Sequence, residues 1–363
     1  MIEAEIAVIG AGPAGATAAL NLAPTRRVVM IERRPDIPRR IGESLVPAAR
    51  RLLTDMGLWP SFEAEPHRPC YGNRAVWGSD HPVETDFLRD PDGHGWHLDR
   101  ARFDAWLRIA AIRRGAQLLA PARLAGLARS GETWRVTLET TAGRVEVTAR
   151  VLIDAGGRTA PLARQLGAKR RKHDRLVCGW IHGRGGGDGL TFVQAVEDGW
   201  WYTAPLPQQR RVLAFHTDAD LPAADIARDR DAIMRHAASV RHLASLLSAA
   251  HFVPDARAGF VAAHSAQLVP CSGEGWLATG DAAVSFDPLS SQGLFNALYT
   301  GLAAAEAADR HLSGAADALT DYGGAIADIW NGYLAQLAHW YGAEPRWADR
   351  PFWRRRLGMR AVA

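Results

Sequence analysis

Residues 280–294 gather the side chains with the clearest chemical potential in this chain. The stretch contains Asp281, Asp287, one proline, three serines, a glutamine and two glycines. An apolar, strand-like run over residues 276–279 leads into it, and an alanine-rich helical pattern over residues 294–310 follows. A strand, a Gly-Asp turn and a long helix can aim backbone N–H groups and a carboxylate at a bound cofactor. The meaning of this stretch therefore depends on whether the chain holds a nucleotide site elsewhere.

A dinucleotide-binding unit is predicted at the start of the chain. A short apolar strand over residues 6–9 is followed by Gly-x-Gly-x-x-Gly at residues 10–15, a helical pattern and a second strand that ends at Glu32. The first glycine makes a tight turn, the second lets the backbone approach a pyrophosphate, and the third lets the helix pack closely on the strand. Glu32 can hold a pair of ribose hydroxyls. An ordinary glycine turn lacks this setting of strand, helix and second strand, so the whole unit is strong evidence for a dinucleotide-binding site.

Two further stretches hold candidate site residues. Glu43 and Ser44 precede a predicted helix, where they either cap that helix or line a cofactor. An aromatic strand is predicted over residues 199–207, and it contains Trp201 and Tyr202. Side chains alternate between the two faces of a strand, so one face packs in the core and the other can wall a pocket.

The remaining pattern predicts a second, antiparallel region. Glycine, proline, histidine and aromatic residues interleave over residues 59–97 without a helical period, and a β-meander is predicted over residues 117–153. More strands are predicted over residues 177–218. The glycine run at residues 183–189 precedes a strand, so it predicts a flexible hairpin loop and not a second nucleotide site. Helical patterns cover residues 101–114, 226–250 and 319–341.

Composition excludes several classes of function. The chain has 363 residues and a formal net charge of +4, and its short basic runs carry no recognition motif, so no nucleic-acid partner is expected. There is no apolar run long enough to span a membrane, and the first residues lack a basic signal region, so a cytoplasmic protein without a membrane partner is expected. Three widely separated cysteines argue against a disulfide framework, and the histidines lack metal spacing, so no metal is expected.

In their order along the chain, these motifs resemble the p-hydroxybenzoate-hydroxylase-like FAD proteins, which include aromatic monooxygenases, geranylgeranyl reductases and flavin-dependent halogenases. The resemblance rests on the unit ending at Glu32, on Arg100-x-x-Phe-Asp, on Asp-Ala-Gly-Gly-Arg at residues 154–158, and on residues 280–288. It implies that FAD is the cofactor. The residues that it implies for binding FAD are Gly10, Gly12, Pro13, Ala14, Gly15, Glu32, Arg33, Ser44, Arg100, Gly280, Asp281, Pro288, Gly293 and Leu294.

The resemblance also implies the fold. We expect an α/β (α+β) chain with a Rossmann-like FAD-binding domain of the glutathione-reductase type, an inserted antiparallel-sheet substrate domain and a C-terminal helical segment. The expected boundaries are residues 1–58, 99–170 and 276–312 for the FAD-binding domain, 59–98 and 171–275 for the substrate domain, and 313–363 for the C-terminal helix and aromatic-basic tail.

Further motifs resemble one halogenase-like branch, the LodB/GoxB-type flavoprotein maturases of quinocofactor-containing amine and amino-acid oxidases, with a more distant likeness to the QhpG type. The motifs are Gly-Glu-Ser-Leu-x-Pro at residues 42–47, the aromatic strand, residues 287–293, and the ending over residues 346–356. This resemblance implies a monooxygenase that hydroxylates a tryptophan side chain within a partner polypeptide during the biogenesis of cysteine tryptophylquinone. The implied partners are the precursor polypeptide of a quinocofactor oxidase, O₂, and NAD(P)H or a separate flavin reductase as the electron source.

Hydroxylation needs a proton donor near the flavin and a base for the substrate. Asp287 and Glu43 are the candidate catalytic residues, although either could instead be a helix cap or part of a structural ion pair. The candidate pocket residues are Ser290, Ser291 and Gln292 as hydrogen-bond donors near the flavin, and Trp201 and Tyr202 as stacking partners of the substrate.

Two other functions stay open. The first is a halogenase or hydroxylase of a small aromatic compound. Tryptophan halogenases carry a lysine in the early substrate region and an acid after the Pro-Leu pair of the loop beside the flavin. This chain has lysine only at positions 169 and 172, and Ser290 follows the matching Pro-Leu at residues 288–289. The second is a flavoprotein chaperone or scaffold that escorts an oxidase precursor through its aromatic-basic tail and the loop-rich residues 59–97.

Overall fold

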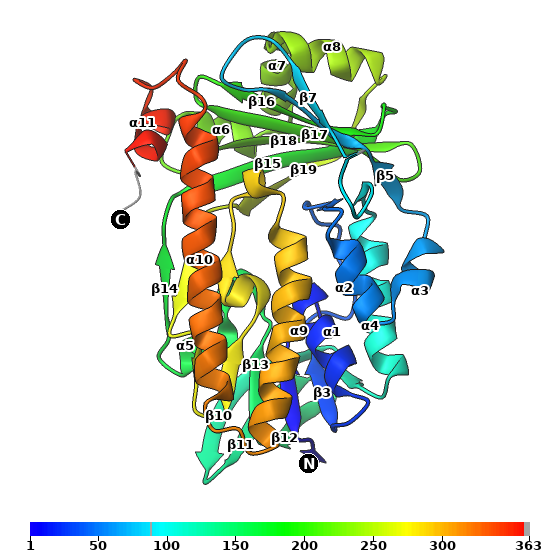
Figure 1. The fold of residues 1–363 in the computed structure, drawn as a ribbon, viewed down its shortest axis with the longest axis vertical. Helices are drawn as coiled ribbons and strands as arrows, with labels where there is room; N and C mark the ends of the chain where they lie inside the picture. Colours follow the sequence, from blue (N-terminus) through cyan, green and yellow to red (C-terminus); the bar gives the residue numbers. More distant parts are fainter. Residues whose placement is uncertain (88, 359–363) are drawn as a thin grey trace.

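The computed structural model describes residues 1–87 and 89–358. Residue 88, in the expected segment 59–98, and residues 359–363, at the end of the expected tail, lie outside the described residues. The molecule is elongated, with a nucleotide-binding end at the bottom of Figure 1 and a large antiparallel sheet at the top.

A six-stranded sheet forms the middle of the nucleotide-binding end, in the order β21-β22-β13-β2-β3-β9. All neighbours are parallel except β21 and β22. The three central strands are wholly buried and apolar apart from one acid, as expected for a parallel sheet that is covered on both faces. The strands are β2 (Ile6–Ile9), β3 (Val28–Ile31), β9 (Gln117–Leu119), β13 (Val151–Asp154), β21 (Ser272–Gly273) and β22 (Trp276–Ala278).

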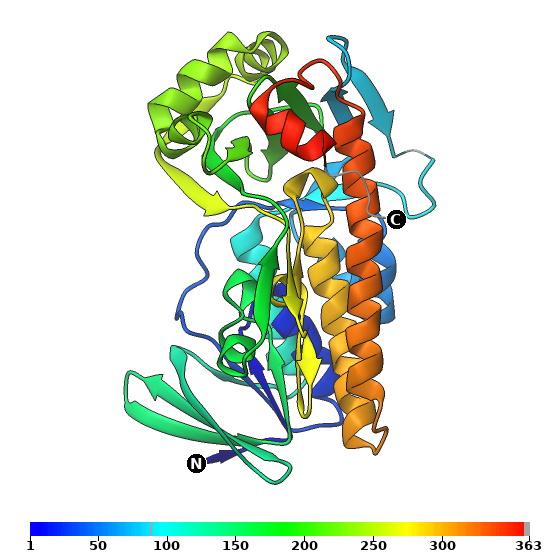
Figure 2. The ribbon, with the colours of Figure 1, turned by 90° about the vertical axis from the view of Figure 1, so that its left-hand side faces the viewer.

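Long helices cover one face of this sheet. Helix α1 (Pro13–Leu22) packs between α4 (Arg100–Arg113) and α9 (Gly293–Leu312). Helix α10 (Ala318–Gly342) runs alongside α9 for most of its length (Figures 1 and 2). Helix α4 begins where the Asp99 side chain accepts a hydrogen bond from the Arg102 amide at 3.1 Å, which satisfies a free N–H of the first turn.

A four-stranded sheet covers the other face, in the order β1-β12-β11-β10 (Figure 2). The predicted meander strand that ends at residue 153 is wrong in one respect, because it divides after Ala149. Its first half alternates in burial and stays in this sheet, whereas its second half is fully buried and joins the six-stranded sheet as β13. The strands are β1 (Ile2–Glu3), β10 (Ala122–Ser130), β11 (Thr133–Thr140) and β12 (Gly143–Ala149).

The seven-stranded sheet at the other end has the order β19-β15-β18-β17-β16-β6-β7. Residues 183–189 do not form the predicted hairpin loop, because β18 and β17 lie between the two strands that the glycine run connects. The run is a crossover. The strands are β6 (Gly72–Val76), β7 (Val83–Asp86), β15 (Leu176–Arg184), β16 (Leu190–Val196), β17 (Gly199–Leu206), β18 (Arg210–Asp218) and β19 (Val253–Ala262).

Three short helices cover the outer face of this sheet where one helix was predicted. The backbone is extended at Asp229 and at Val240, which ends one helix and starts the next. The Asp229 side chain accepts a hydrogen bond from the Ala232 amide at 2.6 Å and so caps the middle helix. The helices are α6 (Ala223–Arg228), α7 (Arg230–Ser239) and α8 (Arg241–Ala249).

Shorter elements connect the two ends. One three-stranded sheet has the order β14-β20-β23 and another has the order β4-β8-β5. The strands of these two sheets and the remaining helices are β4 (Ser44–Leu45), β5 (Arg68–Cys70), β8 (Gly95–His97), β14 (Lys169–Lys172), β20 (Ala266–Val269), β23 (Val284–Ser285), α2 (Ala49–Asp55), α3 (Trp59–Glu63), α5 (Pro161–Gln165) and α11 (Pro351–Leu357).

Within the described residues, no helix has the length and apolar character needed to cross a membrane.

Candidate active site

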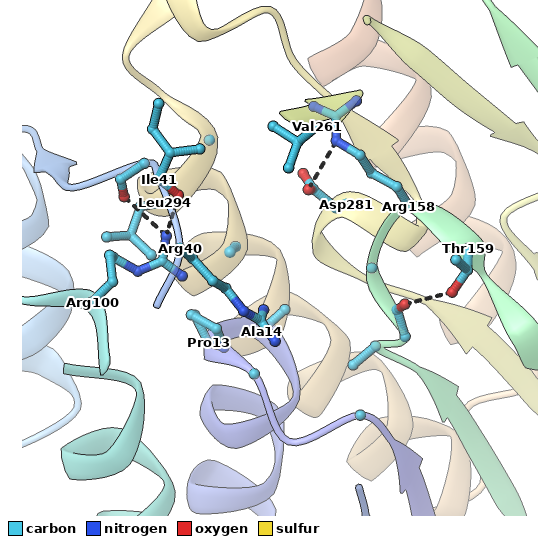
Figure 3. Close-up of a pocket in the computed structure, with 18 of the residues that line it drawn as sticks. Pro13, Ala14, Arg40, Ile41, Arg100, Arg158, Thr159, Val261, Asp281 and Leu294 are labelled. Carbon is cyan, nitrogen blue, oxygen red and sulfur yellow. Dashed lines mark hydrogen bonds and ion pairs between the residues drawn. The ribbon is translucent and has the colours of Figure 1, made fainter. Parts of the chain in front are cut away.

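A cavity of about 1120 Å³ lies between the two ends of the molecule (Figure 3). Its lower part is lined by the turn after β2, by the segment that follows β3 and by residues 155–165. Its upper part is lined by one face of the seven-stranded sheet. The stretch over residues 286–294, here called the flavin loop, contributes to the wall between them. The chain segments that the sequence singled out therefore meet around one space.

The turn of residues 10–15 has the geometry of a phosphate cradle. Gly10 has a φ of +109°, and a Cβ built there would lie 2.3 Å from the carbonyl oxygen of Ala155. A Cβ on Gly12 would meet no atom within 4 Å, although Gly12 lines the cavity at the start of α1. The backbone is thus tightly packed behind the turn and open in front of it, at the positive end of a helix. Gly15 lies beneath the turn, against Gly10.

Glu32 is held at the end of β3 beside this turn. Its Oε2 accepts a hydrogen bond from the Ala11 amide and its Oε1 accepts one from the Arg34 amide, both at 3.1 Å. The carboxylate lines the cavity and is 9% exposed. It is therefore fixed in the position that a ribose-binding acid occupies in a dinucleotide site.

Several arginines surround the lower cavity. Arg100 donates from Nη1 to the Gly42 carbonyl at 2.9 Å, and its other nitrogens bind Asp104 at 3.1 Å. Arg33 also lines the cavity, as does Arg40, whose side chain reaches toward Pro13 and Ala14 (Figure 3). Burial lowers the pKa of Arg40. The sequence predicted Arg33 and Arg100 but missed Arg40, which only its position before the 42–47 motif could have suggested.

The flavin loop brings some of its predicted residues to the cavity and turns others away. Pro288, Ser291, Gly293 and Leu294 line the space, as does Asp281, which pairs with Arg158 at 3.5 Å (Figure 3). Ser290, Gln292 and Gly280 do not line it. Ser290 donates to the Asp287 carbonyl, the Gln292 amide faces Gln336, and Gly280 packs against Ala14.

Asp287 lines the cavity but is almost completely enclosed. Its Oδ1 accepts from the Leu289 amide at 2.9 Å, and its Oδ2 accepts from the Tyr341 hydroxyl at 2.7 Å. Burial and, next, the charge of Asp174 raise the pKa of Asp287 to about 7. This carboxyl group can therefore hold or release a proton near neutral pH, while its first contact also makes it the cap of a short turn.

Glu43 faces the upper cavity and is not a helix cap. Its Oε1 lies 2.6 Å from His182 Nε2 on β15, and its Oε2 accepts from the Gly42 amide at 2.8 Å. The helix that follows has no side-chain cap. Ser44 Oγ lies 2.9 Å from Tyr202 Oη, so Ser44 is not a cap either. The sequence missed His182, which comes from a distant strand.

Trp201 lies outside the site, contrary to the prediction. Its ring is fully buried against Phe215 and His236, in a core cluster shared with the helices behind the sheet. Because side chains alternate along β17, Tyr202 faces the cavity when Trp201 faces those helices. The sheet residues that line the upper cavity are Cys178, Trp180, Tyr202, His216 and Val261.

The site fits FAD. The open face at Gly12, the fixed carboxylate of Glu32 and the arginines suit an adenosine diphosphate half. A Cβ on Gly293 would meet no atom within 4 Å, so a planar ring could approach the backbone of the flavin loop closely. When bound, FAD supplies the electron-transfer chemistry, and the protein supplies position and proton donors.

Comparisons with known proteins also indicate that the chain binds FAD. The chain belongs to the FAD binding domain family, whose model matches residues 3–234. LodB of Marinomonas mediterranea, named as an FAD-dependent oxidoreductase, is 29% identical and is aligned over 98% of this chain and 97% of its own length. The flavin-dependent halogenase CmlS superposes with a TM-score of 0.86 at 26% identity, over 98% of this chain and 68% of CmlS. The chain is an FAD-dependent oxidoreductase.

A further structural neighbour is QhpG, described as a peptidyl tryptophan dihydroxylase essential for tryptophylquinone cofactor biogenesis. It superposes with a TM-score of 0.78 at 24% identity, over 99% of this chain and 80% of QhpG. At this identity the likeness shows the fold. The expected α/β architecture, with an FAD-binding part, an antiparallel sheet and C-terminal helices, is confirmed.

Proposed function

We propose that this protein is an FAD-dependent monooxygenase that hydroxylates an aromatic ring, the indole of a tryptophan carried by a partner polypeptide. The observation that carries the proposal is the upper cavity. There the buried Glu43 carboxylate, held by His182, faces a space that the aromatic and apolar side chains of the seven-stranded sheet enclose. An indole fits such walls, and a positioned carboxylate suits removal of a ring proton.

Several residues around the cavity have separate roles in the proposed hydroxylation. When bound and reduced, FAD would supply the chemistry that activates O₂ for transfer of one oxygen atom to an electron-rich ring. Tyr202, fixed by its hydrogen bond to Ser44, orients the ring, while the enclosing strands exclude water. Glu43 takes the proton that the hydroxylated carbon loses and shares it with His182 Nε2. Asp287, with a pKa of about 7, supplies a proton on the flavin-loop side.

The description of one structural neighbour supports a tryptophan within a polypeptide as the substrate. LodB aligns over nearly the whole of both chains, and QhpG, which shares the fold, is described as acting on peptidyl tryptophan. We infer the precursor of a quinocofactor oxidase as the partner, and NAD(P)H or a separate flavin reductase as the electron source. The predicted cytoplasmic location is compatible with a substrate that is modified before its final assembly.

A halogenase is the alternative that a specific observation favours, namely the superposition on CmlS. A lysine that relays oxidised halide has no counterpart in the described part of this cavity. The two lysines of the chain lie on β14, where Lys169 and Lys172 are exposed. The acid expected after Pro-Leu is replaced by Ser290, which faces away from the cavity.

The test uses the FAD-loaded protein with NADPH, a flavin reductase and O₂. The substrates are N-acetyltryptophanamide and a pooled library of eleven-residue peptides, each with one central tryptophan, with and without bromide. Mass spectrometry should show the gain of one or two oxygen atoms on tryptophan, independent of bromide. Gain of bromine would establish the halogenase instead. Consumption of reductant and O₂ with both substrates unchanged would favour the scaffold.

A further inference from the structure

The edge strand β19 borders the mouth of the cavity. β19 pairs with β15 alone, so one of its long sides has no neighbouring strand among the described residues (Figure 2). Val261 lines the cavity and is 38% exposed, which places the strand at the point where the cavity reaches the surface. β7, at the opposite edge of the sheet, contributes no residue to the cavity.

The hydrogen-bonding groups on the outer side of β19 can be assigned from its register. The Ala263 amide donates to the Leu176 carbonyl at 2.9 Å, and Val261 stands opposite Cys178. Alternate residues of an antiparallel strand bond to the same neighbour. Val261 therefore bonds to β15, whereas the N–H and C=O groups of Phe260 and Ala262 point outward.

Pro254, Asp255 and a register irregularity before Ala258 protect the first part of β19 from pairing, whereas residues 258–262 contain neither proline nor charge. The strand is ten residues long, and Val253, Phe260 and Val261 are among its exposed apolar residues. Natural edges are usually short, charged or covered by another element. Arg257 is exposed and has no ion-pair partner among the described residues, so the strand also offers a positive charge to a neighbour.

We propose that an extended segment of the tryptophan-bearing partner polypeptide pairs with the outer edge of β19 as an additional strand. Main-chain hydrogen bonds to Phe260 and Ala262 would hold the segment, and its tryptophan would enter the cavity past Val261. An acidic residue in the segment would meet Arg257. This inference rests on the proposed function and names how its substrate is recognised: as a strand, not as a free indole.

Proline substitutions test the outward N–H groups. Phe260→Pro and Ala262→Pro each remove one outward donor and leave the bonds to β15 in place, as proline at a sheet edge permits. The controls Phe260→Ala and Ala262→Ser change the side chain and keep the donor. We expect each proline variant to lower the ratio of kcat/KM for library peptides to that for N-acetyltryptophanamide at least tenfold, and each control to keep it within threefold. An unchanged ratio in folded, FAD-loaded proline variants overturns the proposal.

Peptide variants test the same pairing without changing the protein. N-methylation at alternate residues on one phase should abolish peptide turnover, whereas methylation on the other phase should be tolerated, because only one set of amides faces β19. Equal effects of both sets contradict strand pairing.

Hydrogen exchange separates this proposal from the proposed function. Bound peptide should slow exchange of the Phe260 and Ala262 amides at least tenfold. Protection without oxygenation supports the docking edge and overturns the monooxygenase. Oxygenation of the peptides without such protection, and with no effect of the proline substitutions, supports the monooxygenase and overturns the docking edge. Peptides that are neither bound nor oxygenated overturn both.

Discussion

Glu43 is the residue whose surroundings depend most on tertiary structure. It is 1% exposed, yet both of its oxygens have partners, one on its own turn and one on a strand 139 residues away. A buried carboxylate with fixed partners costs less to keep in place than a free one, and its direction is defined. His182 is therefore the residue that we propose to position Glu43, and the sequence contained no spacing that would have paired the two.

Replacing Glu43 with Gln should slow the reaction without emptying the cofactor site. The amide keeps the size of the side chain but cannot accept a proton, so kcat for tryptophan oxygenation should fall by about 10²–10⁴-fold. Mass spectrometry of the product gives the rate, and flavin absorbance gives the occupancy. A fall in bound flavin that accounts for the whole loss of activity would assign Glu43 to cofactor binding. His182→Gln should lower kcat less, with little change in KM.

Asp287 should make the stability of the protein depend on pH. Its pKa is about 7 in the folded chain and near 3.8 in an unfolded one. Between these values the folded state holds the extra proton, so the free energy of unfolding falls as pH rises. Asp154, whose pKa burial raises to about 6, adds a decline of the same sign that ends at lower pH. The decline that Asp287 contributes between pH 6 and 7 should be absent from Asp287→Asn.

Thermal denaturation across pH 5–8 checks this prediction. The melting temperature of the wild type relative to that of the variant should fall as pH rises toward neutral. Parallel curves for the two proteins would show that Asp287 does not titrate in this range. The variant is expected to start from a lower melting temperature at pH 5, because one of its two hydrogen bonds, to Leu289 or to Tyr341, loses its acceptor.

At the scale of elements, local patterns predicted what each segment is but not which way it faces. The unit over residues 6–32 and the helices α9 and α10 agree with their patterns, because apolar periodicity and glycine spacing are local properties. The aromatic strand was also correct as a strand. The sequence could not predict which face of this strand points to the core, since Trp201 and Tyr202 are both aromatic and either could be buried there. In the structure, Trp201 packs with residues of α6–α8, so Tyr202 points to the cavity.

The nucleotide turn supports a matched pair of substitutions. Gly12→Ala should fold normally, because its new methyl group meets no protein atom, but the methyl occupies the space intended for the pyrophosphate. Gly10→Ala should instead destabilise the protein, because the methyl group collides with Ala155 and the backbone φ is positive.

Flavin titration and melting curves distinguish the two effects. We expect Gly12→Ala to keep the melting temperature of the cofactor-free protein within a few degrees and to weaken FAD binding at least tenfold. Gly10→Ala should lower that melting temperature clearly. If Gly12→Ala bound FAD as tightly as the wild type, the pyrophosphate could not lie against this turn.

At the scale of the whole molecule, helix α10 connects the seven-stranded sheet with the flavin loop. Tyr341 accepts a hydrogen bond from Trp200 Nε1 at 3.1 Å on the seven-stranded sheet and donates one to Asp287 in the flavin loop. Helix α10 thereby joins the two ends of the molecule. Composition and motifs predicted a helix and an aromatic-basic tail here. They did not reveal this connection, because it depends on how two sheets from interleaved chain segments are placed.

Arg356 holds that arrangement from α11. Its guanidinium binds Asp218 of β18 at 2.8 Å and lies 3.5 Å from the ring centre of Phe352, and both charged side chains are 2% exposed. Removing Arg356 leaves the buried Asp218 with one remaining cationic partner, the partly exposed Arg355 at 3.0 Å. Arg356→Met should therefore lower the free energy of unfolding by about 1.5–3 kcal/mol, the range for a hydrogen bond to a charged group.

A double-mutant cycle separates the ion pair from simple packing. Adding Asp218→Asn to Arg356→Met should cost less than the sum of the two single changes by about 1 kcal/mol or more, because the buried charge that Arg356 compensates is gone. Denaturant unfolding of the four proteins measures the coupling, and release of flavin fluorescence reports on the site. If the tail also steadies Tyr341 and Asp287, Arg356→Met should release FAD faster than the double variant does. If the two changes in the free energy of unfolding were strictly additive and FAD release were unchanged, α11 would have no influence on the flavin loop.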